Sequence, residues 1–206
     1  MPNSGRLMEL LTPGRACWLA QFHNPRRKTR FDLVLVEYAG VLVSVDARLP
    51  NALIAEMLAA GRLEPFRRYA HFKCEVQLGE SRLDFRLEGP VGVCWVEVKS
   101  VTLVEDGVAR FPDAPTVRGV RHLSMQREAK RHLRELIAAA GRGEQAAVVF
   151  VIQRPDARRF VPHDQADAAF GAALREAANS GVGVYAWACE VSRRAIRVDR
   201  RVAITL

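Results

Sequence analysis

The stretch SRLDFRLEGPVGVCWVEVKSVTLV, residues 81–104, decides the fold, because apolar and polar residues alternate along two runs separated by a turn. Successive side chains of a strand point to opposite faces, so the alternation predicts strands over Arg82–Leu87 and Val93–Val104. Glu88–Pro90 has the residue types of the turn between them. A further strand is expected before them, over His71–Gln77. The three runs together predict an antiparallel meander.

Helices and strands alternate after this meander. We expect a helix over residues 119–141, a strand over 146–152, a helix over 164–179, a strand over 184–188 and an edge strand over 196–206. The continuous apolar run at 146–152 is typical of a strand that is covered on both faces of its sheet. This order predicts a mixed sheet flanked by helices, an α/β (α+β) architecture.

The residues before the meander predict short strands and one helix. Alternation over residues 31–36 and 41–45 indicates two strands joined at Ala39 and Gly40. A helix can open at Pro50 and end at Gly61, since proline suits a first helical turn and glycine a helix end.

Composition narrows the class of protein. The chain has 206 residues, 49% of them hydrophobic, and no apolar run approaches the roughly 20 residues that span a bilayer. No secretory signal is recognisable, so we expect a cytoplasmic protein without a membrane partner. The four scattered cysteines are interpreted as reduced, mostly buried thiols, which argues against a zinc site.

The net charge of +8 favours a polyanionic partner, because neutralising phosphates releases counterions. A bias towards arginine codons explains the choice of Arg over Lys, but not the excess over acidic residues. The loop at residues 24–30 gathers Arg26, Arg27, Lys28 and Arg30. These side chains are either phosphate contacts or part of a solvated turn.

Asp84, Glu97 and Lys99 are the strongest candidates for chemistry. Glu97 and Lys99 lie two residues apart on a hydrophobic strand, so they share a face. Antiparallel pairing can bring Asp84, on the preceding strand, within reach of Glu97. Two neighbouring carboxylates raise each other's pKa, and a divalent cation relieves the repulsion; oxygen ligands suit Mg²⁺ or Mn²⁺. The cation could activate a water for attack on a phosphodiester while Lys99 stabilises the developing charge.

The alternative is a purely structural ion pair, Glu97–Lys99 or Asp84–Lys99. The spacing of these residues alone does not exclude it. Glu75, on the strand before Asp84, is a candidate for an additional carboxylate, although glutamate is common on strand surfaces. The histidines His23, His71, His132 and His163 lack partners at ligand spacing and are interpreted as surface or packing residues.

A second group of candidates lies in the loop at residues 111–119, which two prolines and a glycine order before the long helix. Its polar residues could hold a scissile phosphate or order the waters of a metal ion. The alternative is local capping of the helix, above all by Thr116. The candidates here are Asp113, Thr116, Arg118, Arg121 and His122.

Seven segments spread over the chain together resemble the sugar fermentation stimulation protein A (SfsA) family. They are NSGR at 3–6, LLTPG at 10–14, NPRRKT at 24–29, SRLDF at 81–85, VEVKSVTLV at 96–104, FPDAPT at 111–116 and FVIQRPD at 150–156. The resemblance implies an OB-fold-like β domain, assigned to residues 1–48, and a nuclease-like domain of the PD-(D/E)xK type over 49–206. Asp84, Glu97 and Lys99 then match the acids and the lysine of that motif.

The resemblance also implies non-specific DNA binding, with RNA as an alternative, and a regulatory link to sugar (maltose) metabolism. It leaves two readings open: a metal-dependent nuclease and a non-catalytic DNA-binding regulator. Family members carry further residues before the position of Pro2, which supply the first strands of the barrel. The resemblance therefore implies an incomplete barrel, either because Met1 is an internal start or because those strands were lost.

Overall fold

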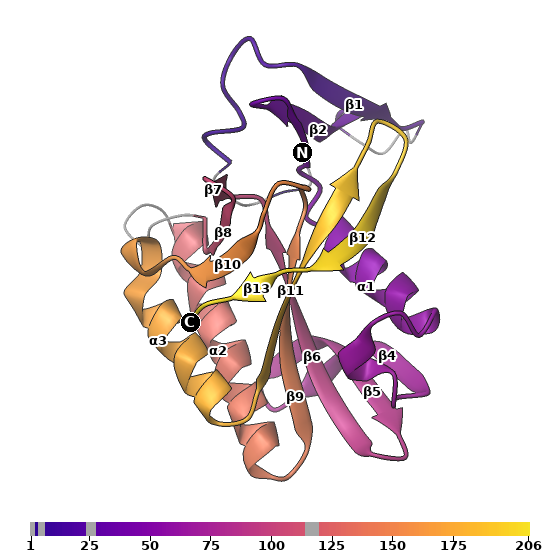
Figure 1. The fold of residues 1–206 in the computed structure, drawn as a ribbon, viewed down its shortest axis with the longest axis vertical. Coiled ribbons are helices and arrows are strands. Elements are labelled where there is room, and N and C mark those ends of the chain that lie inside the picture. Colours follow the sequence, from indigo (N-terminus) through magenta and orange to yellow (C-terminus); the bar gives the residue numbers. More distant parts are fainter. Residues whose placement is uncertain (1–2, 4–6, 24–27, 114–119) are drawn as a thin grey trace.

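A six-stranded mixed sheet forms the centre of the molecule (Figure 1). The structure is a computed structural model that describes residue 3 and residues 7–23, 28–113 and 120–206, with the backbone alone for 120–126. From edge to edge the strands are β12 (Ile196–Arg201), β11 (Gly183–Val191), β9 (Gln145–Ile152), β6 (Gly92–Val101), β5 (Ser81–Gly89) and β4 (His71–Leu78). The inner strands β6, β9 and β11 are parallel, and the outer pairings are antiparallel. The predicted meander and mixed sheet are confirmed.

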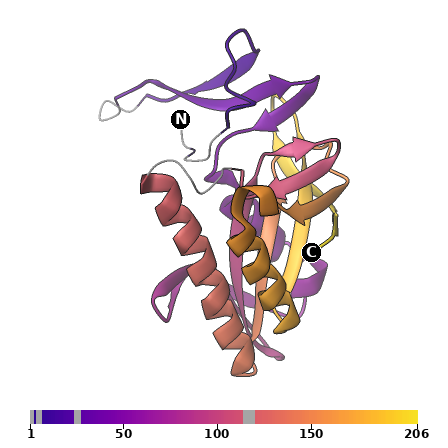
Figure 2. The same cartoon turned by 90° about the vertical axis from the view of Figure 1, so that its left-hand side faces the viewer.

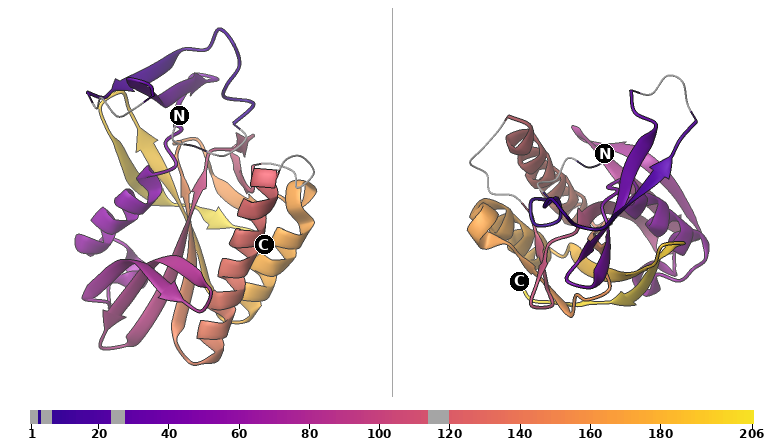
Figure 3. Two further views of the ribbon diagram at one scale, coloured as in Figure 1. Left: turned by 180° about the vertical axis from the view of Figure 1, so that it is seen from behind. Right: turned by 90° about the horizontal axis from the view of Figure 1, so that it is seen from above.

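Helices cover both faces of this sheet, as Figures 2 and 3 show. The helices α2 (Val120–Gly141) and α3 (Asp164–Asn179) pack on one face. The helix α1 (Leu49–Ala59) and the short 3-10 helix η1 (Glu64–Phe66) pack on the other. Two apolar clusters separated by the sheet result, which explains why seven of the eight residues of β9 are buried.

The β4–β5 hairpin changes direction at Asp84. Phe85 packs in the cluster on the α1 side, whereas Leu83, two residues earlier, packs on the α2 side. Residues two apart normally share one face of a sheet, so the strand twists sharply between them. The pairing of β5 with β6 ends at Phe85, and Glu75, opposite Asp84 on β4, has a positive φ of 54°. Asp84 therefore lies where β5 separates from β6.

A separate three-stranded sheet lies at the N-terminal end of the chain, at the top of Figure 1. It consists of β1 (Cys17–Gln21), β2 (Phe31–Tyr38) and β3 (Val41–Ser44), in antiparallel order. The turn at Ala39 and Gly40 has positive φ at both residues, as a tight hairpin requires, and confirms the expected junction. The sheet has its own small core of Leu7, Leu10, Val36, Val43 and Val45.

A small four-stranded sheet, absent from the sequence predictions, joins distant segments. Its order is β13 (Ala203–Ile204), β10 (Arg159–Pro162), β8 (Val108–Phe111) and β7 (Val104–Glu105). Two predicted strands were too long because this sheet takes their ends. β6 stops at Val101 and Val104 starts β7, where it pairs with Ala109. The C-terminal strand breaks at Val202, which is buried and donates its N–H to the Ala186 carbonyl.

The cysteines differ from the expectation of mostly buried thiols. All four are free, but only Cys94 and Cys189 are buried, whereas Cys17 and Cys74 lie exposed on edge strands. Among the residues that the structure describes, no helix is both long and apolar enough to cross a membrane.

Candidate functional site

Asp84 is held by two donors from different elements. The Val98 N–H on β6 donates to Oδ2 of Asp84 at 2.7 Å, and Nδ2 of Asn51 donates to Oδ1 at 2.6 Å. Asn51 lies in the first turn of α1, the helix that packs on the face of the sheet opposite to α2. The carboxylate of Asp84 thus takes a β6 N–H at the place where the pairing with β5 has ended. Both of its oxygens have fixed directions.

Glu97 and Lys99 share a face of β6, as predicted, and contact each other there. Nζ of Lys99 donates to Oε1 of Glu97 at 2.5 Å. Nδ1 of His132, from the middle of α2, lies 2.5 Å from the same oxygen and 3.5 Å from Nζ of Lys99. The pairing of Phe85 with Val96 places Asp84 opposite Glu97. We call Asp84, Glu97, Lys99 and His132 the acidic cluster.

The two carboxylates of the acidic cluster differ in acidity. Burial and then the negative charge of Glu97 raise the pKa of Asp84 to about 6, although the Val98 N–H, Lys99 and Asn51 act in the opposite direction. Burial acts on Glu97 in the same direction, but Lys99 and His132 more than offset it and lower the pKa of Glu97. Glu97 is therefore ionised at neutral pH, and Asp84 is the carboxyl whose charge the protein stabilises poorly.

The acidic cluster leaves two buried polar atoms without a hydrogen bond within the described part of the chain: Oε2 of Glu97 and Nε2 of His132. A buried carboxylate oxygen without a partner is costly unless a cation or water satisfies it. The described residues contain no group of three or more His, Cys, Asp or Glu side chains arranged for a metal. Two carboxylates nevertheless fit Mg²⁺, which usually binds one or two protein carboxylates and keeps several waters. The donor set therefore fits a hard divalent cation.

The other predicted site residues lie outside the acidic cluster or outside the described residues. Glu75 is exposed and forms an ion pair with Arg82 at 3.2 Å. Asp113 lines a cavity of about 260 Å³ together with Tyr38 and His163. Lys28 and Arg30 are exposed between β1 and β2. Arg26, Arg27, Thr116 and Arg118 lie outside the described residues, and Arg121 and His122 belong to α2 with only their backbone described.

Two residues of the site were missed by the sequence analysis. His132 was interpreted as a surface or packing residue, yet its side chain is 8% exposed and contacts Glu97. A signal existed, because His132 follows Ala129 by three residues and precedes Leu136 by four, the spacing of the buried face of α2. Asn51 was expected only to lie in the helix that opens at Pro50, with no role at the site.

A buried hydrogen-bond chain links the N-terminal sheet to the strand that carries the site. Oγ of Ser44, on β3, donates to Oε1 of Gln153 at 3.0 Å, and Nε2 of Gln153 donates to Oγ of Ser100 at 2.9 Å. Ser44 and Gln153 are fully buried. Ser100 follows Lys99 directly, so the N-terminal sheet is anchored beside the acidic cluster.

Two family models match the chain: the SfsA N-terminal OB domain over residues 1–45 and the sugar fermentation stimulation protein RE domain over residues 48–195. A sugar fermentation stimulation protein homolog of Desulforamulus reducens is 43% identical over 206 residues, covering 100% of this chain and 82% of that protein. The homolog of Moorella thermoacetica is 46% identical over 208 residues, covering 100% of this chain and 85% of that protein.

A solved structure shares the fold. The structure of Pyrococcus furiosus SfsA in complex with Ca²⁺ superposes with a TM-score of 0.87 at 29% sequence identity, covering 100% of this chain and 84% of that chain. The expected fold class, mixed α/β with an N-terminal OB domain, is therefore confirmed. From the matched domains, the relatives and the shared fold, it follows that this chain belongs to the sugar fermentation stimulation protein family.

Proposed function

We propose that the protein binds DNA without sequence specificity and hydrolyses its phosphodiester bonds with Mg²⁺ or Mn²⁺ at Asp84, Glu97 and Lys99. One observation carries this proposal: buried Glu97 lies beside the half-buried Lys99 and Asp84, and Oε2 of Glu97 has no hydrogen-bond partner among the described residues. The Ca²⁺ complex of the Pyrococcus furiosus relative supports a divalent-cation site in this chain as well.

Each residue of the acidic cluster has a distinct part in this proposal. Asp84 and Glu97 would hold the cation, which when bound orients and activates a water and offsets charge on the phosphate. The Val98 N–H and Asn51 fix the carboxylate of Asp84, so that it needs no rearrangement to serve as a ligand. Lys99, which is paired with Glu97 in the structure, would turn its ammonium towards the phosphate, where positive charge stabilises the transition state.

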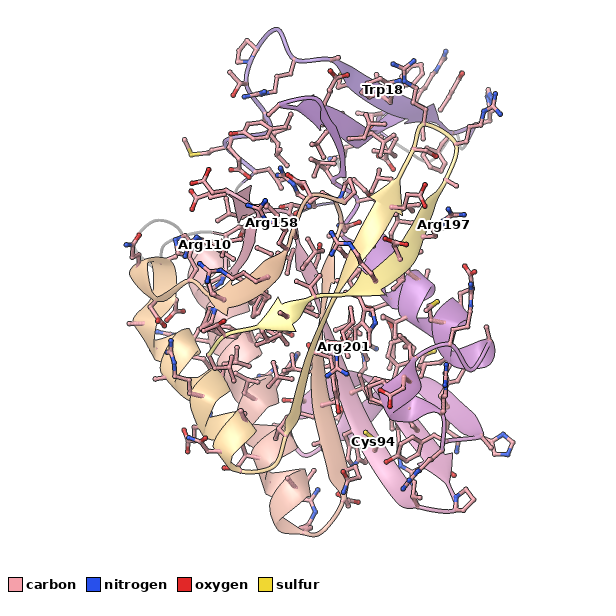
Figure 4. The ribbon with its side chains drawn as sticks, in the orientation of Figure 1. Trp18, Cys94, Arg110, Arg158, Arg197 and Arg201 are labelled. Atoms are coloured by element: carbon pink, nitrogen blue, oxygen red, sulfur yellow. The ribbon has the colours of Figure 1, made fainter. Side chains whose placement is uncertain are left out.

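The charge and the N-terminal sheet support nucleic acid as the partner. The net charge is +8, and Lys28 and Arg30 are exposed near Phe31, a residue that is itself 47% exposed. OB domains bind strands by combining basic grooves with exposed aromatic rings on which bases stack. Trp18, on β1 of the same sheet, is labelled in Figure 4. The guanidinium of Arg193, from the turn between β11 and β12, lies 4.8 Å from the centroid of its ring. These features favour single-stranded over double-stranded DNA.

The arginines on the face shown in Figure 4 contribute less to this binding than their number implies. Arg110, Arg197 and Arg201 each lie within 4 Å of a glutamate, and Arg158 donates to the carbonyl of Asp106. Paired side chains neutralise fewer phosphates and release fewer counterions. The Lys28–Arg30 segment is the stronger candidate for the basic contact.

A cleavage assay tests the proposal. Purified protein is incubated with single- and double-stranded DNA and RNA in Mg²⁺, Mn²⁺ or EDTA, beside Asp84→Ala and the control Glu75→Gln. We expect metal-dependent cleavage by the wild type and by Glu75→Gln, and none above background by Asp84→Ala, with DNA binding retained. Equal cleavage by the wild type and Asp84→Ala, or none with either metal, would contradict the nuclease.

The second candidate is a non-catalytic DNA-binding regulator of sugar (maltose) metabolism genes. The observation that favours it is the ion pair between Lys99 and Glu97 at 2.5 Å, which is also what a purely structural pair would form. Under this reading Asp84→Ala binds DNA like the wild type, and neither protein cleaves with either cation. The same assay therefore separates the two functions.

A further inference from the structure

Glu97 presents its two carboxylate oxygens to different surroundings. Oε1 has two neighbours at 2.5 Å, Nζ of Lys99 and Nδ1 of His132, whereas Oε2 is buried without a hydrogen bond in the described part of the chain. An ionised carboxylate only accepts hydrogen bonds, so Nδ1 of His132 carries the proton and donates it. We propose that His132 is a positioning residue, which fixes Oε1 so that Oε2 is left for the cation. This inference rests on the proposed nuclease site.

The surroundings of His132 suit a fixed donor. Its side chain is 8% exposed and lies on the face of α2 that buries Ala129, Leu133 and Leu136 against the sheet. Close-packed neighbours leave the ring little freedom to turn. Nε2 has no hydrogen bond among the described residues, and the nearest carboxylate oxygen, Oε1 of Glu128, lies 3.9 Å away. Among the described residues, the contact with Glu97 at 2.5 Å is therefore the shortest polar contact of the imidazole, ahead of Lys99 at 3.5 Å.

Oε1 of Glu97 has two donors, Lys99 and His132, and one of them can leave without freeing the carboxylate. In the proposed reaction Lys99 turns its ammonium from Glu97 to the phosphate, and Oε1 then loses a donor. The ring of His132 is buried between α2 and the sheet, so it does not move with Lys99 and keeps the carboxylate in place throughout. Partners of this type, which orient a ligand without touching the metal, typically contribute about 10- to 100-fold to metal affinity.

The test measures Mn²⁺ binding by isothermal titration, with three substitutions of His132. His132→Asn places an amide N–H where Nδ1 stands, His132→Gln places one where Nε2 stands, and His132→Leu places none. We expect His132→Asn to retain most of the wild-type affinity, and His132→Leu and His132→Gln to weaken Mn²⁺ binding about 10- to 100-fold. His163→Leu is the matched control, since its Nδ1 is also hydrogen-bonded, to the carbonyl of Pro112 at 3.0 Å, and it should bind Mn²⁺ like the wild type.

Folding is checked by circular dichroism and thermal melting. If His132→Leu does not fold, the test is the tighter Mn²⁺ binding expected of His132→Asn than of His132→Gln. The inference is overturned if folded His132→Leu binds Mn²⁺ like the wild type, if His132→Asn binds Mn²⁺ as weakly as His132→Gln, or if the wild type binds no Mn²⁺. The proposed function fails separately if the wild type binds Mn²⁺ and His132→Asn binds it more tightly than His132→Gln, but no nucleic acid is cleaved.

Discussion

Two ionic groups, each with a buried charged residue, are carried by the neighbouring strands β6 and β9, and they differ in how many of their polar atoms are hydrogen-bonded. At β6, the acidic cluster leaves Oε2 of Glu97 and Nε2 of His132 without hydrogen bonds in the described chain. After β9, Arg154 is 2% exposed, yet it donates to both oxygens of Asp156 at 2.7 Å and to the Thr102 carbonyl at 3.2 Å. We call Arg154, Asp156 and Thr102 the arginine cluster.

The two clusters also shift their aspartates in opposite directions. Burial acts on both, but Arg154 more than offsets it and lowers the pKa of Asp156, whereas burial raises the pKa of Asp84 to about 6. A buried ionic group that only stabilises the fold is expected to have all its polar atoms hydrogen-bonded. One that takes part in binding or catalysis keeps polar atoms unpaired for a ligand. The arginine cluster fits the first description and the acidic cluster the second.

The largest effect is expected in the arginine cluster. Arg154→Met removes the partner of Asp156 and leaves the Thr102 carbonyl unpaired, so the free energy of unfolding should fall by about 4 kcal/mol. Urea denaturation followed by circular dichroism measures it. The control Arg158→Met loses one exposed hydrogen bond, to the carbonyl of Asp106, and should change stability by no more than about 0.5 kcal/mol. Equal losses of stability in both variants would mean that the arginine cluster contributes no more to stability than an exposed surface contact.

The acidic cluster should show the opposite effect on stability: removing the negative charge of Asp84 stabilises the protein. The pKa of Asp84 is raised from 3.8 to about 6 on folding, so its contribution is fully present below the unfolded value and lost as pH rises through the folded one. In EDTA, the free energy of unfolding of the wild type should fall between about pH 4 and pH 6. The shift corresponds to a loss of about 3 kcal/mol. Asp84→Asn should abolish this fall and be the more stable protein at pH 8.

Magnesium distinguishes this effect from generic relief of repulsion. At pH 8, Mg²⁺ should raise the melting temperature of the wild type, because a cation that binds only the folded state stabilises it. It should leave Asp84→Asn unchanged. A wild type whose stability does not depend on pH in this range, or an Asp84→Asn variant that still responds to Mg²⁺, would remove the contrast between the two clusters.

Local patterns account for what the sequence could predict of the site. Asp84, Glu97 and Lys99 lie on one hairpin, so alternation and antiparallel register suffice to bring them together. His132 contacts Glu97 across 35 residues and Asn51 contacts Asp84 across 33, and both contacts depend on how helices dock on the sheet. Hydrophobic periodicity tells which face of a helix is buried, but not which strand residue it meets.

The same distinction holds for the fold. The six-stranded sheet was predictable because its strands are long and strongly patterned, as in β9. The small sheet was not predictable. Its strands β7 and β13 have two residues each, and β10 pairs with a strand far earlier in the chain, Arg159 with Val108. The OB domain entered through the family resemblance, since three strands alone do not specify a barrel. The boundary at residue 48 stays a prediction.

A smaller effect concerns the acid side of the stability curve. The pKa of Asp156 is lowered on folding, so its contribution is present above the ordinary aspartate pKa and lost as pH falls through the folded value. Asp156→Asn should flatten the wild-type decline below about pH 4, by about 1 kcal/mol because the side chain is a third exposed and screened by solvent. Denaturation in EDTA at several pH values would separate the two aspartates. A change confined to pH 4–6 in this variant would mean that the assignments are exchanged.

The smallest effect should come from Glu75, which faces Asp84 across the β4–β5 pairing but does not join the acidic cluster. Its side chain is 62% exposed and pairs with Arg82, and exposed ion pairs contribute between zero and about 1 kcal/mol. Glu75→Gln should therefore leave stability, its pH dependence and its response to Mg²⁺ close to those of the wild type. Mn²⁺ titration gives the decisive measurement, because a third carboxylate ligand would weaken binding on removal. A loss of affinity in Glu75→Gln would place Glu75 in the cation site, and would mean that the hairpin bends further towards β6 when the cation binds.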